Sequence, residues 1–251
     1  MRTRTPIAHL FANLIALGLT VAGLTVGSMA RADDQRTSAV FSISIRGLSA
    51  ATLTLNGAAM GQRYQASGTL KSAGLLGLVK TIRYDAKVEG RRIADRAVPV
   101  RYSETADTGK RQSAAVMAYK AGVPQVKSYV PPRPPRVDDI DPATQGGTVD
   151  PLTALYLILR DVPAAKACAM KLTLFDGRRR SQIMLGKPAK SGDQITCAGE
   201  YRRLDGFTPE DMAEKNRFAL SLTYGQSAKD MVHVTEISMD TLYGKGRMIR
   251  Q

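Results

Sequence analysis

The chain has 251 residues with a formal net charge of +14, from 36 Lys and Arg against 22 Asp and Glu, and it contains two cysteines and no tryptophan. The basic balance favours anionic partners such as phospholipid headgroups or other envelope polyanions. Nucleic acid is not an expected partner, because no basic run is interleaved with aromatic residues. The cysteines and histidines lack the clustered spacing of a zinc site, so no metal or cofactor is expected.

Residues 1–32 have the pattern of a cleaved signal peptide. Two arginines precede an uncharged apolar run from Leu10 to Val26, and the triplet Ala-Arg-Ala ends the segment. This run is close to the lower limit for crossing a bilayer, so an uncleaved anchor is the alternative. We expect export to the periplasm and one mature domain over 33–251. Three arginines and no acid are removed with the peptide, which leaves 33 basic and 22 acidic residues, a net +11.

Both cysteines, Cys168 and Cys197, fall in the expected mature domain. In an oxidising compartment an even pair of cysteines usually forms a disulfide bond. The loss of chain entropy in a loop of this size corresponds to roughly 3–4 kcal/mol of stabilisation. Two buried free thiols are the alternative. We expect a bond between Cys168 and Cys197.

Apolar and polar residues alternate with period two along much of the chain, which predicts half-buried strands. Clear alternation covers 41–45, 82–89 and 218–224, and weaker alternation covers 53–55, 64–70, 98–102, 170–174 and 195–201. Turns are expected at Asn56-Gly57, Glu89-Gly90, Asp107-Thr108-Gly109, Asp176-Gly177, Ser191-Gly192 and Gly244. Short strands without helical crossovers predict a mainly β fold: a curved antiparallel sheet or open half-barrel with one or two short helices.

One helix is well signalled by the sequence after Asp150. This residue can cap it, Pro151 suits the first helical position, and apolar residues recur at helical spacing from Leu152 to Leu159. The helix should end near Arg160. A second, shorter helix is expected after Thr208.

Prolines are dense in the segment 130–136, which favours extended polyproline II and removes sheet donors. Such a segment could separate two domains. The β pattern is alike on both sides, however, and the first half has few large apolar residues for a core of its own. We interpret the segment as a strap that crosses a single curved sheet.

Several short motifs resemble a known family. The stretch from Val149 to Tyr156, then Phe175-Asp176-Gly177-Arg178 and Cys197, resembles the proteobacterial envelope proteins grouped as domain-of-unknown-function family 3108, and Val98–Tyr102 suits the same pattern. The resemblance spans roughly Ser38 to Met239. It implies an exported β-rich binding or structural module, similar in architecture to the curved half-barrels of periplasmic lipoprotein carriers and related envelope-integrity proteins. It transfers no catalytic residue, because the family has no established chemistry.

An apolar segment breaks the alternation and is a candidate gate. Leu75, Leu76, Leu78 and Val79 are four large aliphatic residues within five positions, too many to leave in water. We predict that they gate an apolar groove on the concave face; a plug of core residues at one end of the sheet is the alternative. Small inward residues would leave room for a groove (Ala66, Gly68 and Ala86), whereas large aromatic residues could fill it (Phe41, Tyr84, Phe218 and Tyr224).

The densest basic cluster is Arg178, Arg179 and Arg180, which we predict to contact anionic surfaces. Its alternative is a solvated strand beginning after a hairpin turn at Asp176-Gly177.

No catalytic site is expected. His233 is the only histidine of the mature part, lies in a predicted strand and has no nucleophile motif to work with. The acidic group Asp138-Asp139-Ile140-Asp141 is interpreted as a loop, which leaves a carboxylate-dependent hydrolase as the least favoured alternative. We expect a non-enzymatic periplasmic protein that binds a lipid or an apolar segment of an envelope protein in the sheet groove. A structural scaffold that docks on anionic surfaces is the main alternative.

Overall fold

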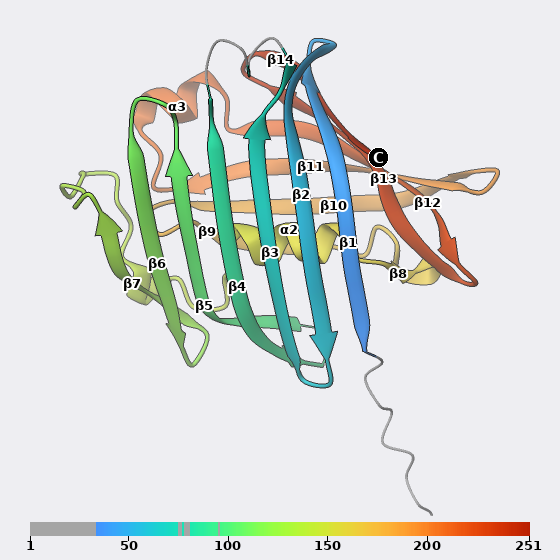
Figure 1. Cartoon of the computed structure of the whole chain (residues 1–251), viewed down its shortest axis with the longest axis horizontal. Helices are drawn as coiled ribbons and strands as arrows, with labels where there is room; N and C mark the ends of the chain where they lie inside the picture. The colour runs from blue at the N-terminus through green and yellow to red at the C-terminus, as the bar shows by residue number, and fades with distance from the viewer. Residues whose placement is uncertain (1–33, 75–76, 78–80, 95) are drawn as a thin grey trace, which may run out of the picture. The chain divides into compact units, whose positions relative to one another are not determined.

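Antiparallel strands make up most of the chain in a computed structural model, which describes residues 34–74, 77, 81–94 and 96–251 (Figure 1). The first seven strands are β1 (Gln35–Ile45), β2 (Leu48–Met60), β3 (Arg63–Ser72), β4 (Arg83–Ile93), β5 (Arg96–Asp107), β6 (Gln112–Lys120) and β7 (Val123–Val130). The others are β8 (Val162–Pro163), β9 (Lys171–Phe175), β10 (Arg180–Ser191), β11 (Gln194–Asp205), β12 (Arg217–Ala228), β13 (Met231–Thr241) and β14 (Gly244–Arg250). The predicted mainly β fold is confirmed, and the expected signal peptide lies outside the described residues.

The strands form one sheet in the order β7-β6-β5-β4-β3-β2-β1-β14-β13-β12-β11-β10-β9, and β8 pairs with β13 beside this path. The first and last strands pair with each other, from Phe41 opposite Arg250 to Ile45 opposite Gly246. Two meanders are thereby joined at the ends of the chain. Strands β7 and β9 are the edges of the described sheet and do not pair, so the sheet is open, as predicted.

The helices begin and end where the sequence places them. Helix α2 (Pro151–Leu159) is capped by Asp150, whose side chain accepts a hydrogen bond from the Thr153 amide, and helix α3 (Pro209–Glu214) is capped by Thr208. Two short 3-10 helices, η1 (Pro142–Thr144) and η2 (Ala164–Lys166), flank α2 along the chain. No described helix has the length and hydropathy needed to cross a bilayer.

Helix α2 lies between the two halves of the sheet (Figure 1). It contacts β3, β4 and β5 of the first meander and β9 and β13 of the second. Its nine residues carry no charge and six of them are buried, because a helix that is apolar on nearly all sides is stable only inside a core. The concave face of the sheet is therefore covered by a segment of the chain itself.

Two predicted turns are wrong, because Asn56-Gly57 lies inside β2 and Glu89-Gly90 lies inside β4. A Cβ atom on Gly57 would lie 2.5 Å from the Tyr156 ring, and one on Gly90 would collide with the Tyr64 ring and the Val98 carbonyl. Both glycines permit close approach within the core rather than a change of chain direction. The other four expected turns do lie at hairpin connections.

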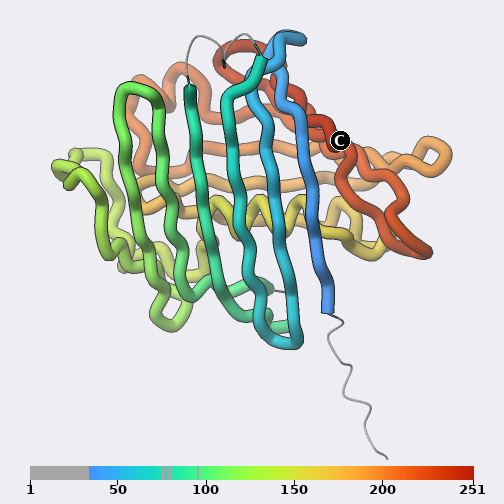
Figure 2. Tube along the Cα trace, viewed as in Figure 1, coloured from blue at the N-terminus to red at the C-terminus, as the bar shows by residue number. Residues whose placement is uncertain are grey.

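The proline-rich segment continues from edge strand β7 to η1 (Figure 2). Arg178, in the turn after β9, donates to both carboxylate oxygens of Asp139, at 2.5 and 2.6 Å, and to the Pro134 carbonyl at 3.2 Å. In the same turn, a Cβ on Gly177 would meet the Tyr129 hydroxyl of β7. These hydrogen bonds and this close approach hold the proline-rich segment and edge strand β7 against the β9–β10 turn.

Candidate functional site

The concave face, where an apolar groove was expected, is filled by side chains of α2. The Leu152 Cδ1 atom lies 2.9 Å from the position that a Cβ on Gly68 would take. The Tyr156 ring covers Gly57 and stacks on the Tyr64 ring, with ring centroids 5.8 Å apart and planes 1° from parallel. The room that small strand residues leave is therefore taken by the helix.

The aromatic residues that were expected as possible core fillers divide into two groups. Phe41, Phe218 and Tyr224 are buried in the core, whereas Tyr84 is 40% exposed at the beginning of β4. Burial raises the pKa of Tyr224 to about 12. Tyr84 therefore contributes little to filling the concave face.

A buried hydrogen-bond network anchors the first turn of α2 to the sheet. The Asp150 carboxylate accepts from the Thr153 amide at 2.8 Å and from the Thr153 hydroxyl at 2.6 Å. Because that hydroxyl gives its single proton to Asp150, the Tyr64 hydroxyl, 2.9 Å away, donates to the Thr153 oxygen. Burial raises the pKa of Asp150 to about 6, against partial compensation by the hydrogen bonds from Thr153.

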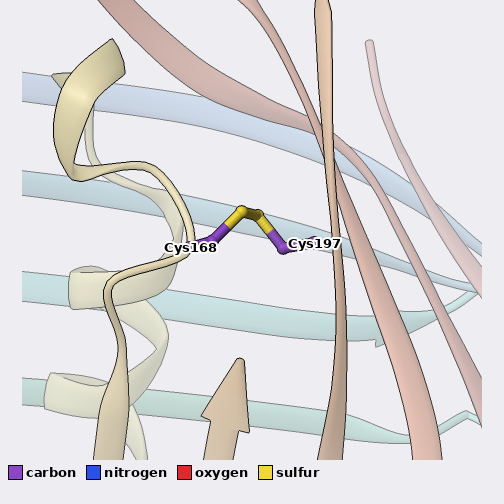
Figure 3. The surroundings of a disulfide bond; sticks show 2 residues. All are labelled: Cys168 and Cys197. Carbon is purple, nitrogen blue, oxygen red and sulfur yellow. A yellow bond between two sulfur atoms is a disulfide. The ribbon is translucent and has the colours of Figure 1, made fainter. Parts of the chain in front are cut away.

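The expected disulfide bond is confirmed, and it fixes the segment that follows α2. Cys168 and Cys197 are both buried, with Cα atoms 5.4 Å apart. Figure 3 shows the bond joining the segment after α2 to a strand of the second meander, which is β11. Helix α2 is thus held at its first turn by Asp150 and beyond its end by Cys168.

The predicted gate cannot be placed, because Leu75, Leu76, Leu78 and Val79 lie outside the described residues.

The three arginines of the predicted anionic contact are half-buried, and the side chains of Arg178 and Arg179 have partners within the protein. Arg178 binds Asp139, and its guanidinium lowers the pKa of that carboxyl below the ordinary value. The Arg179 guanidinium lies 5.1 Å from the centroid of the Phe207 ring. Arg180 begins β10. A contact between this cluster and an anionic surface stays a prediction, but Arg178 already has a structural role.

The residues weighed for catalysis are also tied to the fold. Asp138 pairs with Arg136, Asp139 with Arg178, and Asp141 caps η1. Burial and, as a second cause, the positive charge of Arg250 lower the pKa of His233 below its ordinary value. Among the described residues, His233 has no hydrogen bond to a hydroxyl or carboxylate, and no three His, Cys, Asp or Glu are grouped as metal ligands.

A hollow lies on the opposite, outer face of the first meander, over β2 to β5. Its volume is about 530 Å³, and polar or charged side chains alternate in its lining with small and apolar ones: Asn56, Gly57, Ala58, Gln65, Ala66, Ser67, Lys87, Val88, Glu89, Arg101 and Ser103. No sequence pattern predicts a site on this face: Asn56, Gly57 and Glu89 were expected only in turns, and Ala66 only as a small inward residue. The lining residues lie on four different strands and come together only through the pairing register. Period-two alternation therefore predicts that this face is polar, but it does not predict the hollow.

Comparison with known proteins gives a family but no activity. Residues 40–246 match the family described as "Protein of unknown function (DUF3108)". No curated protein matches the chain. The fold is similar to a solved β-barrel-like protein of domain of unknown function DUF1849 from Brucella abortus, with 13% sequence identity, coverage of 86% of this chain and 96% of that one, and a TM-score of 0.48.

Proposed function

The chain belongs to the DUF3108 family of proteins of unknown function, and we propose that it is an exported, non-enzymatic protein of the cell envelope that acts through its surface. The apolar and cleavage-like pattern of residues 1–32 supports export. The buried disulfide between Cys168 and Cys197 also supports an oxidising compartment such as the periplasm. Contact with anionic surfaces belongs to the same proposal, since the expected mature part carries a net charge of +11 from 33 basic and 22 acidic residues.

One observation carries the proposal: α2 fills the concave face of the sheet. Leu152 packs into the space at Gly68 and Tyr156 into the space at Gly57. An apolar ligand such as a lipid chain, which is the alternative, would have to take the place of α2. That exchange would remove several buried apolar side chains from the core, each contributing roughly 1.5–3 kcal/mol. A helix that is permanently part of the core fits a scaffold or surface-binding module better than a carrier.

Lipid analysis separates the two functions. We expect mass spectrometry of the protein purified from its native envelope to find no stoichiometric lipid, and an apolar fluorescent probe not to bind it. The variant Leu152→Ala is the positive control, because it leaves a cavity beside Gly68 into which the probe can enter. A stoichiometric lipid, or saturable probe binding by the unmodified protein, would contradict the surface function and support the apolar ligand.

Export has its own test. Protein recovered from the periplasmic fraction should begin at Asp33 when its N-terminus is sequenced. A chain that keeps residues 1–32, or that stays in the cytoplasmic fraction, would contradict the proposal.

A further inference from the structure

We propose that the hollow on the outer face of β2 to β5 binds a polar ligand that carries a phosphate or carboxylate group. Its volume of about 530 Å³ falls within the range of small-molecule sites. The hollow exists because Ala58, Ser67 and Ser103 are short, while longer polar side chains surround them. It lies on the side of the sheet away from α2, so the inference goes beyond the proposed function and holds whether or not the concave face takes a ligand.

Two rows of side chains cross the hollow from strand to strand. In the first row Lys87 lies opposite both Ser67 and Ser103, and in the second Glu89 lies opposite both Gln65 and Arg101. Lys87 and Arg101 are thus diagonal neighbours on β4 and β5, a placement that separates two residues by roughly 7–8 Å. Two long cationic side chains at that spacing can both donate to one oxyanion between them.

The charged groups of the hollow are not used within the protein. Across the described ranges, Lys87, Glu89 and Arg101 form no ion pair and no side-chain hydrogen bond with one another or with other residues. Comparable groups elsewhere on the sheet do pair: Arg247 with Glu236 at 2.8 Å and Arg217 with Glu200 at 2.6 Å. The donors of Lys87 and Arg101 are therefore available to a ligand.

The charge around the hollow selects an anion. Beyond the second row, Arg63 and Arg91 lie opposite each other on β3 and β4, and both are exposed. Together with Lys87 and Arg101 they place four cations near Glu89, the one carboxylate of the lining, while Asp85, just beyond the first row, is paired with Arg83. Such a surface attracts anions and orients them as they approach.

Uncharged groups complete the site. The amide of Gln65 and the hydroxyls of Ser67 and Ser103 can both donate and accept hydrogen bonds. They suit the hydroxyl or amide groups of the rest of a ligand whose anionic group lies between Lys87 and Arg101. The ligand class is therefore a phosphorylated or carboxylated polar molecule rather than an apolar one.

Calorimetric titration of the unmodified protein tests the site, with glucose 6-phosphate as the probe and glucose as its uncharged match. We expect glucose 6-phosphate to bind and glucose to bind at least tenfold more weakly. The double change Lys87→Ala with Arg101→Ala should weaken binding at least tenfold. Glu89→Gln should strengthen it severalfold, because it removes the one carboxylate of the hollow. Vesicles of phosphatidylglycerol, against phosphatidylcholine, form a second arm that detects a phosphate borne by a lipid headgroup.

The matched control is Lys187→Ala with Lys190→Ala, which removes the same charge from exposed residues of β10. This control should change binding less than twofold. Binding of vesicles but not of glucose 6-phosphate, with the same response to the variants, would support the site and identify a lipid headgroup as the source of the phosphate. Equal loss in both double variants, no loss in the Lys87 and Arg101 variant, or no binding in either arm would overturn the proposal.

Discussion

The two faces of strands β2 to β4 use small residues in opposite ways. On the inner face Gly57, Gly68 and Gly90 are covered by aromatic or aliphatic side chains that come within van der Waals reach of their backbone. On the outer face no other described element covers Ala58 and Ser67, and these short side chains leave a hollow. Neighbouring residues of a strand point to opposite faces. The consecutive residues Gly57 and Ala58 therefore belong to the covered inner face and to the open outer face, respectively. A small residue in a strand therefore means room only where no other element covers that face.

The difference comes from what lies next to each face. The inner face meets a helix without a charged residue, whose burial removes apolar surface from water. The outer face is rimmed by long charged side chains such as Lys87 and Arg101, whose hydration keeps them from collapsing into the hollow. The same comparison orders the expected effects of substitution, from the inner face to the outer.

Removal of the disulfide should have the largest effect, because it releases the segment after α2 from β11. Replacing both Cys168 and Cys197 by Ser should lower the free energy of unfolding by about 3–4 kcal/mol, measured by urea denaturation. The unmodified protein with its disulfide reduced should unfold at a similar urea concentration. An unchanged midpoint in both would show that α2 is held without the bond.

The buried carboxyl of Asp150 should make stability depend on pH. Its pKa is raised from the ordinary 3.8 to about 6, so folding disfavours the ionised form. Its contribution to stability is therefore fully present below about pH 4 and is lost as the pH rises through about 6, by about 3 kcal/mol in total.

The matched variant for this prediction is Asp150→Asn, which keeps an oxygen to accept from the Thr153 amide but does not titrate. Carboxyls that pair on the surface titrate in both proteins, so their effect cancels in the comparison. The difference in unfolding free energy between the two proteins should change by about 3 kcal/mol between pH 4 and pH 7. A difference that does not vary with pH would contradict the burial of Asp150.

A pair of substitutions compares the two faces directly. Gly57→Ala places a Cβ 2.5 Å from the Tyr156 ring and should cost about 1–3 kcal/mol, because the ring and the helix must shift. Ser67→Ala, on the outer face of the neighbouring strand, should change stability by no more than about 0.5 kcal/mol. Chemical denaturation of both variants measures the contrast. Equal costs would mean that α2 is not packed against β2 as described.

The sequence predicts the elements better than it predicts what the glycines do. Asp150, Pro151 and the apolar spacing after them predict α2 correctly, because capping and periodicity are local properties. The prediction failed at Gly57 and Gly90, where the same residue type that makes turns is needed for contact with Tyr156 and Tyr64. Gly57 and Tyr156 are about 100 positions apart in the sequence, and Gly90 and Tyr64 are 26 positions apart. No local pattern can predict contacts between such distant residues.

The candidate sites show the same limit. The disulfide could be predicted because the two cysteines have only each other to pair with in the expected mature part. The outer hollow could not, because Lys87 and Arg101 become neighbours only through the register of β4 and β5. Arg178, in contrast, has no partner nearby in the sequence, because Asp139, which it binds, lies 39 residues away along the chain.

Hydrogen exchange of the α2 amides under native conditions tests the central claim most directly, that this helix is a permanent part of the core. The amides of Ala154 to Leu159 should exchange only through global unfolding, with the same free energy of opening as the most protected amides of β12 and β13. Exchange of α2 at a clearly lower free energy, while those strands stay protected, would show that the helix leaves the concave face and would contradict the account.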